Sequence, residues 1–264
     1  MAWRAYWTVF KNSFVGQLEY RSETVVRILT GLVSFISVFY LWNDVFAAKA
    51  VMAGYTKPQI ITYYLLVAYI FASIFTSLDI SAEIRDGQLS GYLLRPISYL
   101  WYNYWFSLAR RAFRFVIGLP ILIGLLWLLR DHVYWVGDIK AYLVLALAMY
   151  GAVNILFLSD AFRNILEFWV VNSDAWDMIF DHLVGFFSGT MIPLVFLPGW
   201  IQTLADYLPF KYTGTFLVDA FMGRLSWTEI GVGFMLQTLW TVAMALVLSL
   251  VWQRGLKRYE AYGN

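Results

Sequence analysis

Cysteine is absent from the 264-residue sequence, and histidine occurs only twice. The absence of thiols excludes disulfide bonds and thiolate catalysis. No carboxylate–histidine spacing around His132 or His182 resembles a metal site, so we expect both to be structural or interfacial histidines. The sequence therefore predicts no bound metal.

Charged residues are also scarce. They make up 14% of the chain, compared with roughly 25% in soluble domains. Hydrophobic residues make up 61%, and the mean hydropathy is +0.64. This composition predicts a membrane protein in contact with lipid. The net charge of +2 indicates no nucleic-acid partner, because membrane orientation already explains the basic residues.

Long apolar runs define the predicted fold. A helix needs about 20 mostly apolar residues to cross the hydrocarbon core of a bilayer. The third run is short, so we expect its helix to extend back over Trp105–Arg114, with arginines that reach the headgroups. We predict one all-α, polytopic transmembrane domain over residues 1–264, with six membrane-spanning helices at Val25–Phe46, Gln59–Leu78, Phe115–Leu129, Ile139–Leu158, Met178–Leu197 and Ile230–Trp252.

The distribution of basic residues predicts the orientation. With the N-terminus inside, thirteen of the 19 Lys and Arg residues fall on the cytoplasmic side of the six spans. Cytoplasmic loops carry an excess of Lys and Arg. We therefore expect a multi-pass protein of the cell (inner) membrane with both termini in the cytoplasm.

Residues 1–22 are predicted to form an amphipathic helix at the inner membrane interface. Trp3, Trp7, Phe10, Phe14 and Leu18 recur every three or four positions, as on one face of a helix. Such a helix lies in the interface plane, with its apolar face toward lipid. Its role is either that of a membrane anchor or that of an elbow that also positions a partner.

The sequence contains no obvious energy source of its own. Asp79, Asp160 and Asp181 lie toward the cytoplasmic ends of predicted spans, where we favour pairing with Arg85 or Arg163 over a proton relay. No lysine follows a glycine, which excludes a P-loop for ATP. If the chain moves a substrate uphill, the energy must enter through another protein.

A polar island at residues 83–98 separates the second and third spans. Asp86 is placed to cap a short helix over Gln88–Leu94, and Pro96 ends it. Such a helix can insert apolar side chains into a groove of a soluble partner, while flanking charges set its register. An ordinary interfacial loop helix is the alternative. The expected contact residues are Glu83, Arg85, Asp86, Leu89, Tyr92, Leu93 and Arg95.

Two motifs resemble permeases of the ABC-2 type. The island EIRDGQLSGYLLRPI (Glu83–Ile97) is similar to the family's coupling helix, which sits on the nucleotide-binding subunit. SGTMIPLVFLPGWIQ (Ser188–Gln202) is similar to the end of the fifth span and an outer re-entrant hairpin. The resemblance covers nearly the whole chain. It implies a re-entrant segment at residues 193–215 that includes Pro193, Pro198, Gly199, Trp200 and Pro209.

The resemblance implies a permease subunit of an ATP-binding cassette transporter. Two permeases, identical or related, would form a dimer, and each would dock on a P-loop ATPase that holds ATP and Mg. This chain would then bind no cofactor and would not be an enzyme. By position in the family, the dimer interface or substrate path would include Phe35, Phe39, Tyr69, Phe75, Phe187 and Met191.

The apolar, charge-poor spans favour a hydrophobic or amphipathic substrate, such as a drug, a lipid-like molecule or a peptide, and the family resemblance implies its export. The same aromatic residues are also compatible with contacts to lipid or neighbouring helices. An energy-independent lipid scramblase or channel would explain the missing coupling charges but not the polar island. A membrane-embedded enzyme would have to use Asp79, Asp160, Asp181 and His182.

Overall fold

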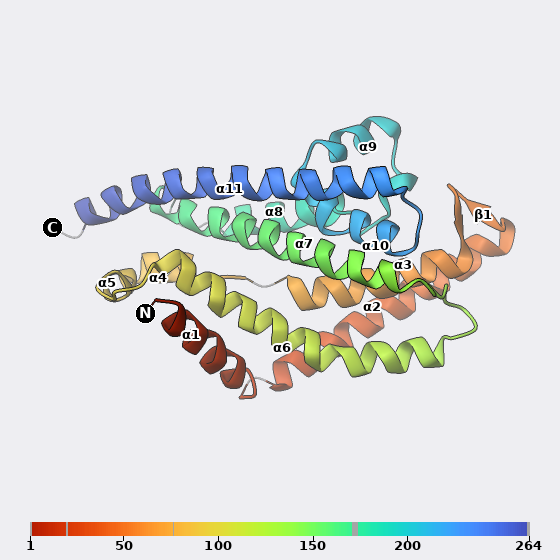
Figure 1. Ribbon diagram of the computed structural model, residues 1–264, viewed down its shortest axis with the longest axis horizontal. Helices are drawn as coiled ribbons and strands as arrows, with labels where there is room; N and C mark the ends of the chain where they lie inside the picture. Colours follow the sequence, from red (N-terminus) through yellow and green to blue (C-terminus); the bar gives the residue numbers. More distant parts are fainter. Residues whose placement is uncertain (1, 20, 76, 171–173, 263–264) are drawn as a thin grey trace.

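The fold, seen in a computed structural model, is a bundle of long helices with short elements at its ends (Figure 1). The structure describes residues 2–19, 21–75, 77–170 and 174–262. Two short strands, β1 (Val51–Met52) and β2 (Tyr55–Thr56), form an antiparallel hairpin. The α-helices are α1 (Ala2–Gly16), α2 (Arg21–Ala48), α3 (Lys57–Ile74), α4 (Ile80–Arg85), α5 (Leu89–Leu93), α6 (Tyr99–Leu128), α7 (Ile139–Ile165), α8 (Asp174–Phe187), α9 (Gly199–Asp206), α10 (Thr215–Phe221) and α11 (Trp227–Tyr262). Short 3-10 helices occur at η1 (Leu166–Phe168), η2 (Leu194–Phe196) and η3 (Pro209–Thr213).

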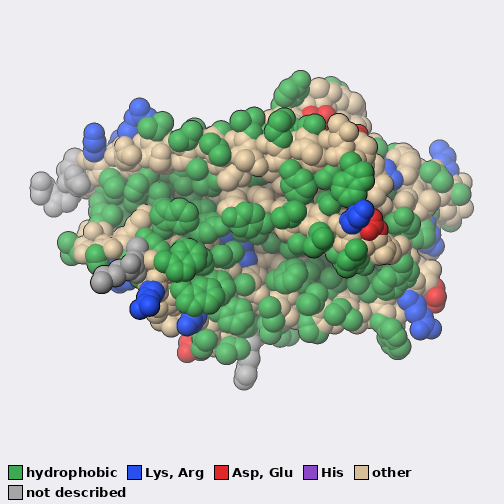
Figure 2. Space-filling view, viewed as in Figure 1, with side chains coloured by type: hydrophobic (Ala, Val, Ile, Leu, Met, Phe, Trp, Pro, Cys, Tyr) green, Lys and Arg blue, Asp and Glu red, His purple; other side chains and the backbone are tan. Residues whose placement is uncertain are grey.

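Four helices in the described part of the chain are long and apolar enough to cross a membrane, namely α3, α6, α7 and α11. Shorter apolar stretches lie in α2 (Val33–Ala48) and α8 (Met178–Phe187). Hydrophobic side chains cover the middle of the face shown in Figure 2, and most visible Lys and Arg lie toward its two ends. The prediction of an all-α membrane protein is confirmed, whereas the count of six spans stays a prediction.

The bounds of α6 and α8 differ in how well they match the predicted third and fifth spans. Helix α6 includes Trp105–Arg114, as predicted for the third run. The fifth run does not continue to Leu197, because α8 ends at Phe187. Gly189 then has a φ angle of +80°, a left-handed value that glycine adopts readily and a helix does not contain. The break lies at the polar sequence Ser188-Gly189-Thr190, within the predicted span Met178–Leu197.

After α8 the chain folds back onto its own end. The Thr215 backbone N–H donates to the Ser188 carbonyl at 2.7 Å. The Tyr63 hydroxyl, on α3, donates to the Gly189 carbonyl at 2.8 Å and lies 2.9 Å from the Thr215 hydroxyl. Helix α10 is almost wholly buried against α3 and α7. These contacts fix the C-terminal end of α8 to α3.

Four of the five residues predicted for the re-entrant segment lie at element boundaries. Pro193 and Pro198 immediately precede η2 and α9, Gly199 begins α9, and Pro209 begins η3. Proline suits the first positions of a helix, because its φ angle is already fixed there and its missing N–H is not needed. Trp200 is exposed on α9. The segment is therefore a chain of short helices, and its re-entrant position at the outer side of the membrane stays a prediction.

Two arginines of α6 do not have the role that the sequence suggested. Arg111 and Arg114 are buried. They donate to the carbonyls of Ile74 at 2.7 Å and Phe75 at 2.8 Å. The last carbonyls of a helix lack intrahelical partners and carry a partial negative charge. These guanidinium groups therefore stabilise the C-terminal end of α3 and do not reach lipid headgroups.

Gly151 of α7 lies in the tight contact between α7 and α11. A Cβ atom at this position would collide with the side-chain amide of Gln237. That amide is held by its own donations to the carbonyls of Ala148 at 2.9 Å and Tyr212 at 2.8 Å. We expect Gly151→Ala to destabilise the protein by about 1–3 kcal/mol, as overpacking does, and to lower the Tm in detergent.

Gly124 on α6 provides the matched control, because a Cβ atom there has no neighbour within 4 Å. Gly124→Ala should leave the Tm unchanged or raise it slightly, since alanine favours the helix by up to about 1 kcal/mol. Equal Tm values for the two variants would contradict the packing described between α7 and α11.

Candidate docking site

The candidate site is the segment between α3 and α6, here called the connecting segment (residues 77–98). It contains α4 and α5, joined by a tight turn in which Gly87 has a φ angle of +73°. Asp86 completes the last turn of α4, where its N–H donates to the Ala82 carbonyl at 2.9 Å. The prediction that Asp86 caps the following helix is wrong, because Gln88 occupies the N-cap position of α5.

One side of the connecting segment is an apolar anchor. Ile80 and Leu89 are fully buried and belong to a cluster with Tyr99 of α6 and Phe168 of η1. Leu89 was predicted to contact a partner, but the structure places it in this cluster. Burying a leucine side chain stabilises by roughly 1.5–3 kcal/mol. Leu89 therefore holds α5 against the bundle.

The other side of the connecting segment is exposed. Leu93 is 41% and Leu94 is 88% exposed, and Arg85, Asp86 and Arg95 of the same segment are exposed as well. Sequence reasoning missed Leu94, because a helical period counted from Leu89 selects Leu93 and assigns Leu94 to another face. Leu93 and Leu94, here called the Leu93–Leu94 knob, thus combine exposed apolar area with exposed charges in one short segment, a combination found at protein contact surfaces.

Tyr92 lies between the buried and exposed sides. The Arg95 guanidinium stacks over its ring, 4.5 Å from the centroid. Burial and the nearby Glu83 carboxylate raise the pKa of Tyr92 to about 12, so its hydroxyl stays protonated at physiological pH. Glu83 also accepts a hydrogen bond from the Tyr99 hydroxyl. Glu83, Tyr92 and Arg95 thus stiffen the connecting segment from within.

A polar stripe on the last turns of α7 and on η1 holds the connecting segment in place. Asp160 accepts a hydrogen bond from the Leu78 N–H at 2.7 Å, and Asn164 accepts one from the Ser81 N–H at 3.1 Å. The stripe, here called the α7 anchor, has the helical spacing i, i+3, i+4 and i+7 and consists of Asp160, Arg163, Asn164 and Glu167, all buried.

Glu167 completes this attachment through an ion pair with Arg85 at 3.1 Å. The first N–H groups of a helix have no intrahelical acceptor, so Asn164 acts as a cap for α4 that comes from a different helix. Hydrogen bonds to charged groups are each worth about 1.5–3 kcal/mol. Together these contacts make the connecting segment and the end of α7 one rigid unit.

The expected pairing of carboxylates is confirmed for Arg163. This guanidinium pairs with Asp160 and, at 2.9 Å, with Asp181. Asp79 lies 3.8 Å from Arg110. His182, which an embedded enzyme would need, is exposed, and its Nδ1 lies 2.6 Å from the Met178 carbonyl. The acidic residues are therefore used in ion pairs.

Two terminal helices also contact the connecting segment. The Tyr6 hydroxyl on α1 accepts a hydrogen bond from the Ser98 N–H at 3.0 Å. On α11, the Tyr259 hydroxyl lies 3.0 Å from the Ser90 hydroxyl. Helix α1 packs along α6 through an edge-to-face contact of Trp3 with Trp105 (4.9 Å). A partner bound to the connecting segment would therefore also act on α1 and α11.

The six residues predicted for a substrate path or dimer interface are spread over α2, α3, α8 and the turns that follow α3 and α8. Phe35 and Phe39 lie on α2, and the Tyr69 hydroxyl donates to the Phe115 carbonyl at 2.8 Å. Phe75 stacks on Phe71 at 5.1 Å. Phe187 is the last residue of α8, and Met191 lies exposed after it.

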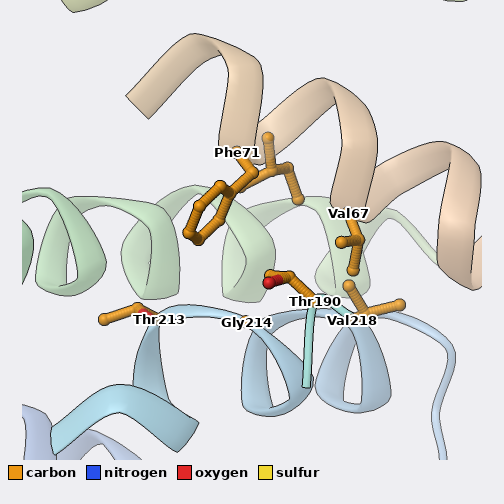
Figure 3. A pocket seen from close by; sticks show the side chains of 7 residues that line it. Val67, Phe71, Thr190, Thr213, Gly214 and Val218 are labelled. Carbon is orange, nitrogen blue, oxygen red and sulfur yellow. The ribbon is translucent and has the colours of Figure 1, made fainter. Parts of the chain in front are cut away.

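A small pocket lies between α3, α10 and the turn after α8 (Figure 3). It has no enclosed space large enough for a water molecule, whereas typical ligand sites enclose roughly 300–1,000 Å³. The six predicted path residues are not among its lining residues, which are Val67, Ile70, Phe71, Thr190, Thr213, Gly214 and Val218. This pocket is too small for a drug-sized or lipid-like substrate.

The family model described as "ABC-2 family transporter protein" matches residues 32–263. This range runs from α2 to the end of α11 and includes the connecting segment and the α7 anchor. Comparison with curated proteins and with solved structures gives no match.

Because the chain has no native cysteine, single cysteines can report the two sides of the connecting segment. We expect Leu94→Cys to react with a maleimide in detergent and Leu89→Cys to be protected. The rate ratio should be roughly tenfold or more, the factor that about 1.4 kcal/mol of local opening produces. Equal rates would show that α5 is not anchored through Leu89.

Proposed function

The chain belongs to the ABC-2 family of transporter proteins, and on that premise we propose that it is the membrane-spanning permease subunit of an ATP-binding cassette transporter. A separate P-loop ATPase, which holds ATP and Mg, binds the connecting segment and drives the transport. The single observation that carries this proposal is the exposed Leu93–Leu94 knob on a rigidly anchored connecting segment.

A permease without its own ATP site needs a surface that transmits force. The Leu93–Leu94 knob offers apolar area for a groove, and Arg85, Asp86 and Arg95 supply charges that fix the register. The attachment to α7 means that a push on the knob moves a membrane helix. An ordinary interfacial loop would have no reason to be tied to α7 and η1 through three buried polar side chains, Asp160, Asn164 and Glu167.

The transport path lies between two permease chains, identical or related. The pocket found inside one chain is too small for a substrate. The faces of α2 and α8 expose apolar residues, among them Val33, Ile36, Met178 and Leu183. In the dimer, these surfaces of one chain face α2 and α8 of the other chain. They suit a hydrophobic or amphipathic cargo, such as a drug, a lipid-like molecule or a peptide, which the transporter exports.

The same proposal fixes the topology. Helices α2, α3, α6, α7, α8 and α11 cross the cell membrane, both termini and the connecting segment face the cytoplasm, and α1 lies in the inner interface. Residues 193–215, with η2, α9 and η3, then form the outer re-entrant segment. The excess of Lys and Arg on the cytoplasmic side supports this orientation, and so does the contact of α1 with the connecting segment.

The docking surface is tested by co-purification. We expect the tagged chain, extracted from native membranes in mild detergent, to retain a P-loop ATPase that mass spectrometry identifies. Leu93→Asp should remove it, because a carboxylate in an apolar contact costs about 2 kcal/mol or more at a hot spot, which weakens binding roughly thirtyfold.

Leu204→Asp is the matched control, because it makes the same substitution at a leucine of similar exposure, 44%, on α9 outside the connecting segment. It should retain the ATPase. If the unmodified chain carries no ATPase under conditions that preserve other membrane complexes, the proposed function is wrong. If Leu93→Asp binds the ATPase as well as Leu204→Asp does, the docking surface lies elsewhere.

A further inference from the structure

The α7 anchor also reaches α8. Arg163 is buried on α7, and its guanidinium pairs with Asp160 on one side and with Asp181 of α8 on the other. Asp160 is the residue that accepts the hydrogen bond from the Leu78 N–H. The Arg163 guanidinium also lies 5.9 Å from the centre of the Phe180 ring. A continuous chain of polar contacts thus joins the connecting segment, α7 and α8.

Helix α8 is held differently at its two ends. Its C-terminal end runs into the turn that Tyr63 and Thr215 fix through the Ser188 and Gly189 carbonyls. One and a half turns earlier, Asp181 links α8 to α7 through an ion pair whose carboxylate side is 42% exposed and whose guanidinium side is 8% exposed. A helix with one fixed end and one ion-paired half can pivot about the fixed end.

We propose that Asp181 is a positioning residue that transmits the position of the connecting segment to α8 through Arg163. This inference rests on the proposed function, because it assigns the route by which a docked ATPase moves the helix at the dimer interface. When the connecting segment shifts, Leu78 displaces Asp160, Arg163 follows its buried partner, and the inner half of α8 follows Arg163.

The chemistry explains why an ion pair suits this role. Arg163 is buried and must keep a negative partner, since an unpaired buried charge is strongly unfavourable. Asp160 is attached to the connecting segment, whereas Asp181 is partly exposed and can exchange its partner for water. The Arg163–Asp181 contact is therefore the weaker, reversible link, as a coupling element with two arrangements requires.

The test uses the complex of the chain with its co-purified ATPase. A spin label at Met178→Cys, an exposed position one turn before Asp181, reports the surroundings of α8 by EPR. The spectrum is recorded without nucleotide and after trapping with ATP and vanadate. We expect the unmodified background to show two different spectra. Asp181→Asn should lose this difference while the ATPase still co-purifies, and Asp181→Glu should restore it.

Asp131→Asn is the control, because it removes an exposed carboxylate far from α8 in sequence and should leave the nucleotide response intact. A response that persists in Asp181→Asn, or one that is absent from the unmodified background, overturns the relay alone. If no ATPase co-purifies with the unmodified chain, the proposed function and the relay fall together. These outcomes separate a failure of the relay from a failure of the proposed function.

Discussion

The rest of the arrangement depends on the interactions that satisfy the buried Asp160 carboxylate. Burying a carboxylate is costly unless it is paired and hydrogen-bonded. Asp160 meets this requirement by pairing with Arg163 on its own helix and by accepting the Leu78 N–H from the connecting segment. The need to satisfy one buried charge therefore ties a short loop to a long helix. That tie converts the connecting segment from a surface loop into a part of the bundle.

The same constraint recurs where other helices end. A bilayer offers no water to unpaired backbone groups, so the protein must satisfy them internally. Arg111 and Arg114 bind the last carbonyls at the end of α3. Asn164 binds an N–H at the start of α4. In both cases the side chain comes from a neighbouring helix, so that satisfying a helix end also fixes how two helices pack.

Hydropathy predicted the long helices because their apolar runs are long and continuous, and the reach of α6 followed from the short third run. The end of the fifth helix was predicted too late, because the apolar residues from Met191 to Leu197 extend the run past Ser188-Gly189-Thr190, where α8 ends. The burial of Arg111 was also missed, since a basic residue near the end of a span is equally compatible with a headgroup contact. Both outcomes depend on which helix lies nearby, and a single sequence does not contain that information.

The site shows the same division. The polar island was recognisable from its composition, but its inward side at Leu89 and its exposed side at Leu94 depend on packing against η1 and α6. Asp160, Asn164 and Glu167 lie beyond the predicted span Ile139–Leu158, so the sequence did not indicate that they share one face of α7 and η1. Nothing in the sequence indicated that the opposing groups were the Leu78 and Ser81 N–H groups, because the stripe faces backbone atoms.

The most direct test of this account is a cryo-electron microscopy structure of the chain with its co-purified ATPase in lipid nanodiscs. The account predicts that Leu93 and Leu94 lie in the ATPase contact while Asp160 still accepts the hydrogen bond from the Leu78 N–H. An ATPase seated on another surface, or a connecting segment detached from α7 in the complex, would contradict it.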